Sequence, residues 1–221
     1  VLVQTVMLLM FKFTRWQSHF ERLLSGNGYL ATEYVSALSV AVVMLTPQIL
    51  LLLPLYVARV GGDLVAKEAE DGTLRMILSR PISRLRLLLV KWLSGMVFAA
   101  MLVLVLGGIA LGFARLLFPW KGLFVFAPLV GTFGIFPPGE GLTLFAFSHL
   151  FIVVNAITLL SVAFMFSCCN IKPAAATILA FSYLFVTMGL QPLPLFEPSQ
   201  TWSIPHPFVS CILVLVRERR V

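Results

Sequence analysis

A dense run of charge at residues 63–86 lies between two long apolar stretches. Nine of the 24 residues in this range are ionisable. They are Asp63, Lys67, Glu68, Glu70, Asp71, Arg75, Arg80, Arg84 and Arg86. A charge at the centre of a membrane helix costs roughly 2.5–3.5 kcal/mol, so burying all nine would cost on the order of 25 kcal/mol. The charged run therefore lies outside any membrane that its flanks cross.

Composition indicates that those apolar flanks lie in a membrane. Apolar residues make up 60% of the chain and charged residues only 11%, which predicts an integral membrane protein. The net charge is +7, but the basic residues concentrate at the ends of apolar runs. That distribution is typical of a membrane topology signal, so we predict no nucleic-acid partner.

Apolar runs of membrane-spanning length predict an all-α polytopic membrane helix bundle, with about six transmembrane helices in a single domain over residues 1–221. The predicted spans are residues 1–13 (partial), 35–60, 87–113, 142–166, 173–190 and 208–216, and a loop at 61–86 joins the second to the third. The first run lacks the basic start and cleavage site of a signal peptide, so we expect a truncated first transmembrane helix.

Prolines and glycines are expected to shape the second span. Pro47 and Pro54 each remove a backbone donor and are expected to kink it. Gly61 and Gly62 are expected to end it. A further apolar stretch, 122–136, is too short to cross and is flanked by proline and glycine, which predicts a re-entrant or interfacial segment between spans three and four.

Basic residues orient this topology. With six crossings, eleven of the sixteen Lys and Arg residues lie on one side of the membrane. They are Arg59, Lys67, Arg75, Arg80, Arg84, Arg86, Lys91, Lys172, Arg217, Arg219 and Arg220. A seventh crossing at 122–136 would divide the basic residues less sharply. The positive-inside rule therefore predicts that loop 61–86 is cytoplasmic.

Local signals predict a short helix inside this loop. Asp71 or Thr73 is expected to cap its N-terminus. Pro81 disfavours the helical conformation in the residue before it, so the helix is expected to end at about Ser79. Ser83 is then expected to cap the helix that leads into the third span.

The order Glu68-x-Glu70-x-Gly72-Thr73-Leu74, followed by Leu78, Pro81-Ile82-Ser83-Arg84 and Lys91, resembles the cytoplasmic loop of ABC-2 type transporter permeases. The resemblance implies a permease subunit of an ATP-driven exporter, whose loop is a coupling helix that contacts a separate ATP-binding subunit. It also implies a second permease copy, in a homodimer or related heterodimer, surrounding membrane lipid, and the cytoplasmic membrane of a bacterium or archaeon. Candidate partner-binding residues are Glu68, Glu70, Gly72, Thr73, Leu74, Ile77, Leu78, Pro81 and Arg84.

Other interpretations stay open at this point. The loop is alternatively a solvated connection whose charges only set topology, or the protein is a membrane scaffold or assembly factor that docks an ATPase without transporting a substrate. The sequence has no G-x-x-x-x-G-K-[ST], H-E-x-x-H or G-x-S-x-G motif. We therefore predict no enzyme activity, cofactor or metal, and ATP hydrolysis on a partner chain.

Polar residues inside the predicted spans are candidates for a substrate path. Gln48, Asn155 and Thr158 fill this role, with hydrogen bonding between helices as the alternative. The mostly uncharged spans weakly favour a lipid-like or amphipathic cargo over a small ion. Gly108-x-x-x-Gly112 permits close helix approach, either within the chain or across a dimer.

Overall fold

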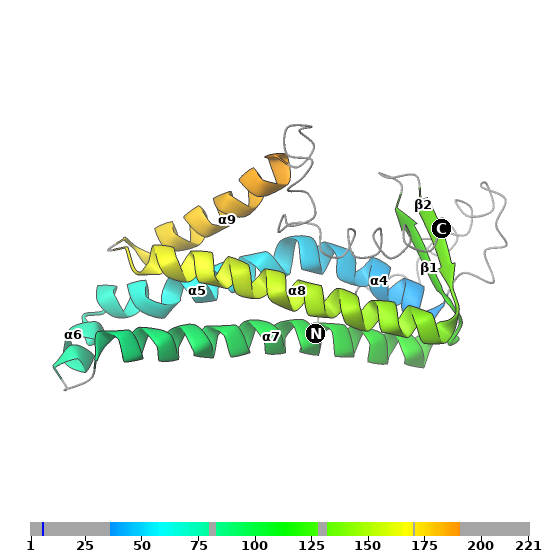
Figure 1. Ribbon diagram of the computed structural model, residues 1–221, viewed down its shortest axis with the longest axis horizontal. Coiled ribbons are helices and arrows are strands. Elements are labelled where there is room, and N and C mark those ends of the chain that lie inside the picture. Colours follow the sequence, from blue (N-terminus) through cyan, green and yellow to red (C-terminus); the bar gives the residue numbers. More distant parts are fainter. Residues whose placement is uncertain (1–5, 7–35, 80–82, 128–131, 170, 191–221) are drawn as a thin grey trace. The chain divides into compact units, whose positions relative to one another are not determined.

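The computed structural model describes residue 6 and residues 36–79, 83–127, 132–169 and 171–190 (Figure 1). Its backbone is almost entirely helical there, as predicted. The elements are α4 (Ala37–Pro47), the π-helix η1 (Gln48–Leu52), α5 (Leu53–Glu70), α6 (Thr73–Leu78), α7 (Arg84–Leu117), β1 (Leu123–Ala127), β2 (Thr132–Phe136), α8 (Pro138–Ser167) and α9 (Pro173–Leu190). The predicted spans at 1–13 and 208–216 fall outside the described residues, apart from residue 6.

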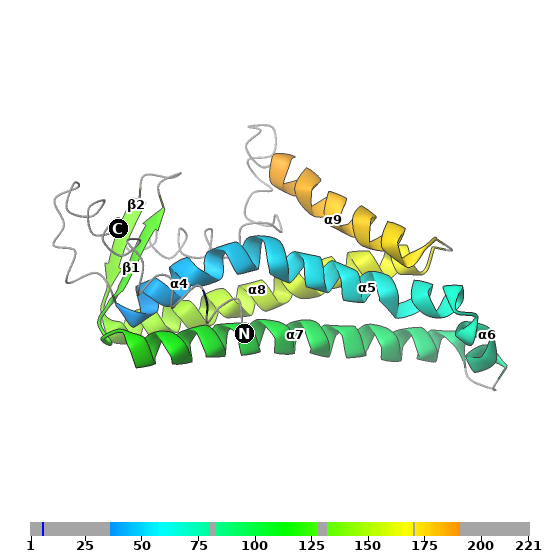
Figure 2. The ribbon, with the colours of Figure 1, turned by 180° about the vertical axis from the view of Figure 1, so that it is seen from behind.

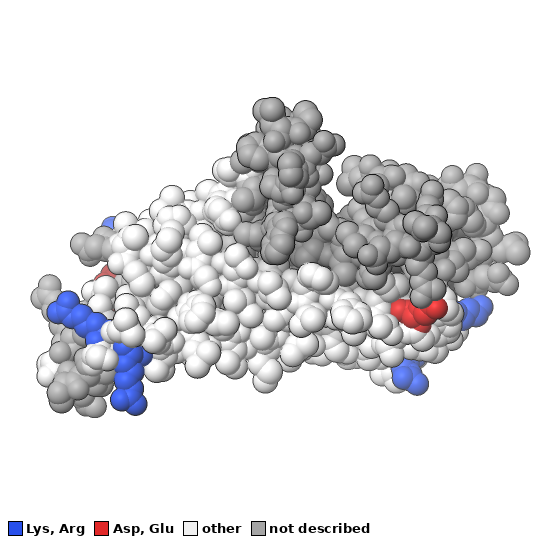
Figure 3. Space-filling view, in the orientation of Figure 1, with Lys and Arg blue, Asp and Glu red and all other residues white. Residues whose placement is uncertain are grey.

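Within the described residues, three helical stretches are long and apolar enough to cross a membrane: Ala37–Glu70, Arg84–Leu117 and Pro138–Ser167. They have 34, 34 and 30 residues, whereas a span needs about 20. A further apolar helix, α9, is shorter. On the face in Figure 3, the charged side chains drawn in blue and red lie near helix ends, and the described surface of α7 and α8 between them is white. This pattern suits helices whose middles contact lipid.

The first long stretch remains helical through both of its prolines. Pro47 ends α4 and Pro54 lies in the first turn of α5, where its missing N–H is tolerated. Between them the backbone widens into η1 instead of breaking. The helix also continues past Gly61 and Gly62, so the helix end expected at these glycines is wrong. Their packing, given below, supplies the reason.

The segment between α7 and α8 is a β-hairpin, which is the exception to an all-α fold. β1 and β2 pair antiparallel, with Leu123 opposite Phe136 and Ala127 opposite Thr132. The expectation of a re-entrant or interfacial segment did not include strands. Because the strands are antiparallel, the hairpin begins and ends at the same end of the sheet. This segment therefore does not cross as a single span.

Two buried serines attach the hairpin to the start of α4, beside which β1 lies in Figures 1 and 2. The hydroxyl of Ser36 donates to the carbonyl of Gly122 at 2.5 Å. The hydroxyl oxygen of Ser39 accepts from the N–H of Phe124 at 2.9 Å. A Cβ at Gly122 would collide with the carbonyl oxygen of Phe136, so glycine is required at this approach.

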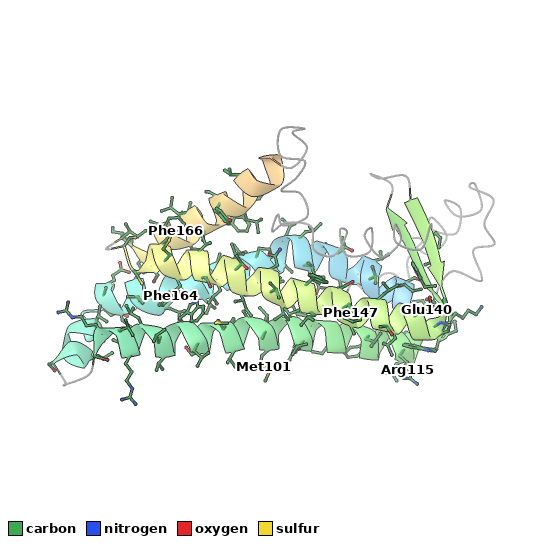
Figure 4. The ribbon with its side chains drawn as sticks, viewed as in Figure 1. Met101, Arg115, Glu140, Phe147, Phe164 and Phe166 are labelled. Atoms are coloured by element: carbon green, nitrogen blue, oxygen red, sulfur yellow. The ribbon has the colours of Figure 1, made fainter. Side chains whose placement is uncertain are left out.

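Backbone contacts divide the chain into two compact units. The first comprises residues 1–49, 104–149 and 211–221, and the second comprises 50–103 and 150–210. The hairpin and α4 belong to the first, whereas α5, α6, α9 and parts of α7 and α8 belong to the second. In the second unit Ala58, Ala163 and Ala180 form a buried cluster, against which Phe166 packs (Figure 4). These small side chains let α5, α8 and α9 approach closely.

We expect Ser39→Ala to lower the free energy of unfolding by about 1 kcal/mol, because it deletes a buried hydrogen bond to β1. Thermal unfolding in detergent measures the loss. Ser94→Ala is the matched control, since its exposed hydroxyl donates only to the carbonyl of Lys91 on its own helix. Equal losses in the two variants would argue against a role of Ser39 in holding the hairpin.

Candidate functional site

The predicted short helix exists and closes the turn between two membrane-length helices. α5 ends at Glu70, Gly72 turns the chain with a φ of 73°, and α6 runs from Thr73 to Leu78. The predicted end at about Ser79 is confirmed. α7 begins at Arg84, and the hydroxyl of Ser83 accepts from the N–H of Arg86 at 3.4 Å, as expected of a cap. We call residues 68–84 the coupling segment, after the role that its sequence leads us to expect.

Thr73 ties α6 to α5, a role different from the cap that the sequence suggested. Its hydroxyl donates to the carbonyl of Glu68 at 3.2 Å, within the last turn of α5. Because α5 lacks a following helical turn there, this carbonyl has no later N–H of its own helix to accept from. The bond therefore closes the end of α5 and fixes where α6 begins.

Among the side chains of the coupling segment that the structure describes, one large apolar side chain is exposed. Met76 is 68% exposed, whereas Leu74 and Ile77 are half-buried. Exposed polar residues flank it, namely Glu70, Asp71 and Arg84, together with the exposed Gly72. Leu78 is the last residue of α6, and Pro81 lies outside the described residues. Sequence reasoning did not single out Met76.

Glu68 turns inward and bonds α7 rather than lining this exposed face. Its Oε1 lies 2.5 Å from the Nζ of Lys91, and the same Nζ donates to the carbonyl of Leu64 at 2.8 Å. The Lys91 side chain is 14% exposed and that of Glu68 is 34% exposed. One lysine thus holds both a carboxylate and a backbone carbonyl of α5. This contact joins the two helices that flank α6.

Gly61 and Gly62 lie in the middle of α5, where a side chain would not fit. A Cβ at Gly61 would be 2.7 Å from the Cβ of Ala163 on α8, and one at Gly62 would be 2.6 Å from the Oγ1 of Thr177 on α9. Glycine is unfavourable inside a helix by roughly 1 kcal/mol relative to alanine. Close approach to two helices explains both its presence here and the continuation of α5.

Ser167, the last residue of α8, completes this junction and was missed by sequence reasoning. Its buried hydroxyl oxygen accepts from the N–H groups of Val65 at 3.0 Å and Ala66 at 2.9 Å, and it donates to the carbonyl of Gly62 at 2.7 Å. A glycine pair inside an apolar helix was the available signal, because it marks a place where another helix reaches the backbone. Nothing in the sequence indicates which serine does so.

A second hydrogen bond joins α7 to α8 near this contact. The Nε1–H of Trp92 on α7 donates to the hydroxyl of Ser161 on α8 at 3.0 Å, about two turns from Ser167.

The residue after Ser167 is a cysteine with a raised pKa. Burial raises the pKa of the Cys168 thiol, and the neighbouring Cys169 raises it further. The Cys168 thiol is therefore protonated at neutral pH.

The three substrate-path candidates have different environments. Gln48 lies in the first unit, is 3% exposed, and its Nε2 has no hydrogen-bond partner among the described residues. Asn155 is half-buried on α8 in the second unit. Thr158, one turn later, donates to the carbonyl of Val154 at 2.9 Å, so its hydroxyl is satisfied by its own helix.

A family model described as ABC-2 family transporter protein matches residues 3–212 of the chain. This match covers most of the sequence, including the whole coupling segment and the junction behind it. Searches of curated proteins and of solved structures gave no match.

We expect Lys91→Met to lower the free energy of unfolding by about 2 kcal/mol, because it leaves Glu68 without its partner in a partly buried place. A double-mutant cycle with Glu68→Gln isolates the interaction, measured by SDS denaturation in mixed micelles. The double variant should lose less than the sum of the two single losses. Lys67→Met, which changes an exposed lysine beside Glu68 on α5, should have little effect. Strictly additive losses would show that the ion pair is not an energetic link.

Proposed function

Since the chain belongs to the ABC-2 transporter family and is an integral membrane permease subunit, we propose that it exports a substrate with energy from ATP hydrolysed on a separate ATP-binding subunit. The family supports association with such a subunit. The observation that carries the proposal is the coupling segment, a short helix at the turn between two membrane-length helices with an exposed apolar side chain at its tip. A soluble partner that contacts this tip acts on α5 and α7 together.

The partner surface combines an apolar centre with a polar rim. Met76 supplies the most exposed contact, and Leu74 and Ile77 lie half-buried behind it. Glu70, Gly72 and Arg84 are exposed around them. Protein interfaces commonly place a methionine or aromatic residue at the centre and charges at the edge. The partner contacts predicted for Thr73, Leu78 and Pro81 stay part of the proposal, and Glu68 acts from inside through Lys91.

The rest of the proposal concerns the cargo and assembly. A lipid-like or amphipathic molecule suits an uncharged interior better than a small ion does, and Gln48, Asn155 and Thr158 remain the candidate polar points on its path. A second permease copy completes the transporter. A Cβ at Gly108 or Gly112 would meet no described atom within 4 Å, so this motif stays open to a helix from outside the chain. The coupling segment faces the cytoplasm, and the membrane is the cytoplasmic membrane of a bacterium or archaeon.

Reconstitution separates this function from that of a scaffold. Vesicles that hold the chain with its ATP-binding partner are expected to move a labelled lipid or amphipathic probe in the presence of ATP. A control with a hydrolysis-deficient partner should show no movement. Stimulated ATP hydrolysis without movement of any probe in a broad panel would favour a scaffold that docks an ATPase.

We expect Met76→Asp to weaken binding of the ATP-binding subunit at least tenfold, because it puts a charge at the apolar centre of the contact. Leu74→Asp should do the same. Co-purification and microscale affinity measurements in nanodiscs report the change. Leu116→Asp is the matched control, since Leu116 is 82% exposed at the opposite end of α7. Unchanged affinity and ATPase stimulation in Met76→Asp would exclude α6 as the docking surface.

A further inference from the structure

The hydroxyl of Ser167 occupies an unusual place on the backbone of α5. In a regular α-helix the N–H of Ala66 pairs with the carbonyl of Gly62, four residues earlier. Here Ser167 bonds both of these groups, and also the N–H of Val65. A side chain of α8 therefore bonds α5 at two backbone groups that a regular helix pairs with each other, and α5 is helical on both sides of this point.

A hydroxyl is suited to this role because it accepts and donates at once. When it bridges, the two N–H groups and the carbonyl of α5 are all satisfied. When it withdraws, all three groups lose this partner. Because loss of a hydrogen bond is costly in an apolar environment, the hydroxyl holds α5 against the end of α8.

Gly61 and Gly62 bring α5 into direct contact with both neighbouring helices. Gly61 touches α8 and Gly62 touches α9 without intervening side chains. A sliding or rotation of α5 by a fraction of a turn therefore acts directly on both neighbours. Ser167 is also the last residue of α8, and only residues 168–172 separate it from the start of α9. The bond consequently holds α5 at the point where the chain passes from α8 to α9.

We propose that Ser167 is a positioning residue that carries displacement of the coupling segment from α5 into α8 and α9. This inference rests on the proposed function, because the displacement originates in the partner that docks on α6. Its route is short, since the bonded groups of Gly62, Val65 and Ala66 immediately precede the turn that holds Glu68. Lys91 links that same turn to α7, so α5 is held from two sides by two different contacts.

The first test concerns the hydrogen bonds between Ser167 and α5, and it needs no partner. Hydrogen–deuterium exchange of the purified chain in nanodiscs is followed in peptides that cover residues 62–70. Ser167→Ala removes the hydroxyl oxygen that accepts from the N–H groups of Val65 and Ala66, while the glycine contacts still hold α5 in place. The amides of Val65 and Ala66 should therefore exchange about tenfold faster. Ser161→Ala is the matched control, since it deletes a serine hydroxyl of the same helix that accepts from Trp92 instead. Equal exchange in Ser167→Ala and the unmodified chain would overturn the inference.

The second test concerns transmission in the complex with the ATP-binding subunit. Spin labels on unnatural amino acids at positions 93 and 178, where Leu93 and Ile178 are 58% and 64% exposed, report the separation of α7 and α9 and lie outside the proposed docking surface. We expect the unmodified complex and Ser161→Ala to change this distance between the nucleotide-free and vanadate-trapped states. Ser167→Ala should lose at least half of the change while still binding the partner. This loss with retained binding distinguishes a positioning role from general destabilisation.

The two tests separate the inference from the function on which it rests. A distance change of full size in Ser167→Ala overturns the inference, as does a partner-bound unmodified complex without any change. Absence of partner binding to the unmodified chain contradicts the proposed function and, with it, transmission through Ser167. The exchange result then still decides whether the hydroxyl holds the backbone of α5.

Discussion

Close approach of α5 to α8 and α9 at Gly61 and Gly62 is the constraint on which the rest of the second unit depends. Two adjacent residues without side chains place one helix backbone against two others. In an apolar surrounding, every backbone group at such a contact needs a partner within the protein. The Ser167 hydroxyl supplies it, and the alanine cluster of α5, α8 and α9 extends the same close packing. Small side chains and satisfied backbone groups therefore work together here.

Local chemistry made the coupling segment predictable. A proline two residues after Ser79 excludes further helix, and Gly72 permits the positive φ of the turn. These signals act over a few residues and depend little on tertiary contacts. The long apolar runs were predictable for a similar reason, because their length and lack of charge place them in a membrane whatever their packing. The fold class and the bounds of α6 could thus be derived from sequence alone.

Tertiary contacts decided what the sequence did not reveal. Glycine is ordinarily a helix breaker, and only the positions of Ala163 and Thr177 show why α5 continues through it. In the sequence, Glu68 cannot be distinguished from its acidic neighbours, and only the fold shows that it pairs with Lys91, 23 residues later. The hairpin followed from pairing between two short apolar segments whose composition also suits an interfacial helix. In each case the deciding partner is distant in sequence.

The pairing of Lys91 with Glu68 gives this lysine two successive roles. In the newly made chain, before α5 and α7 meet, the positive-inside rule predicts that its charge helps to orient the helix hairpin during membrane insertion. Once the helices pack, the carboxylate neutralises that charge and the ammonium group becomes part of the protein interior. Folding therefore pairs the same positive charge that the positive-inside rule counts in the unfolded chain. Reversal of the inserted hairpin would then require breaking an internal ion pair as well as moving charge through lipid.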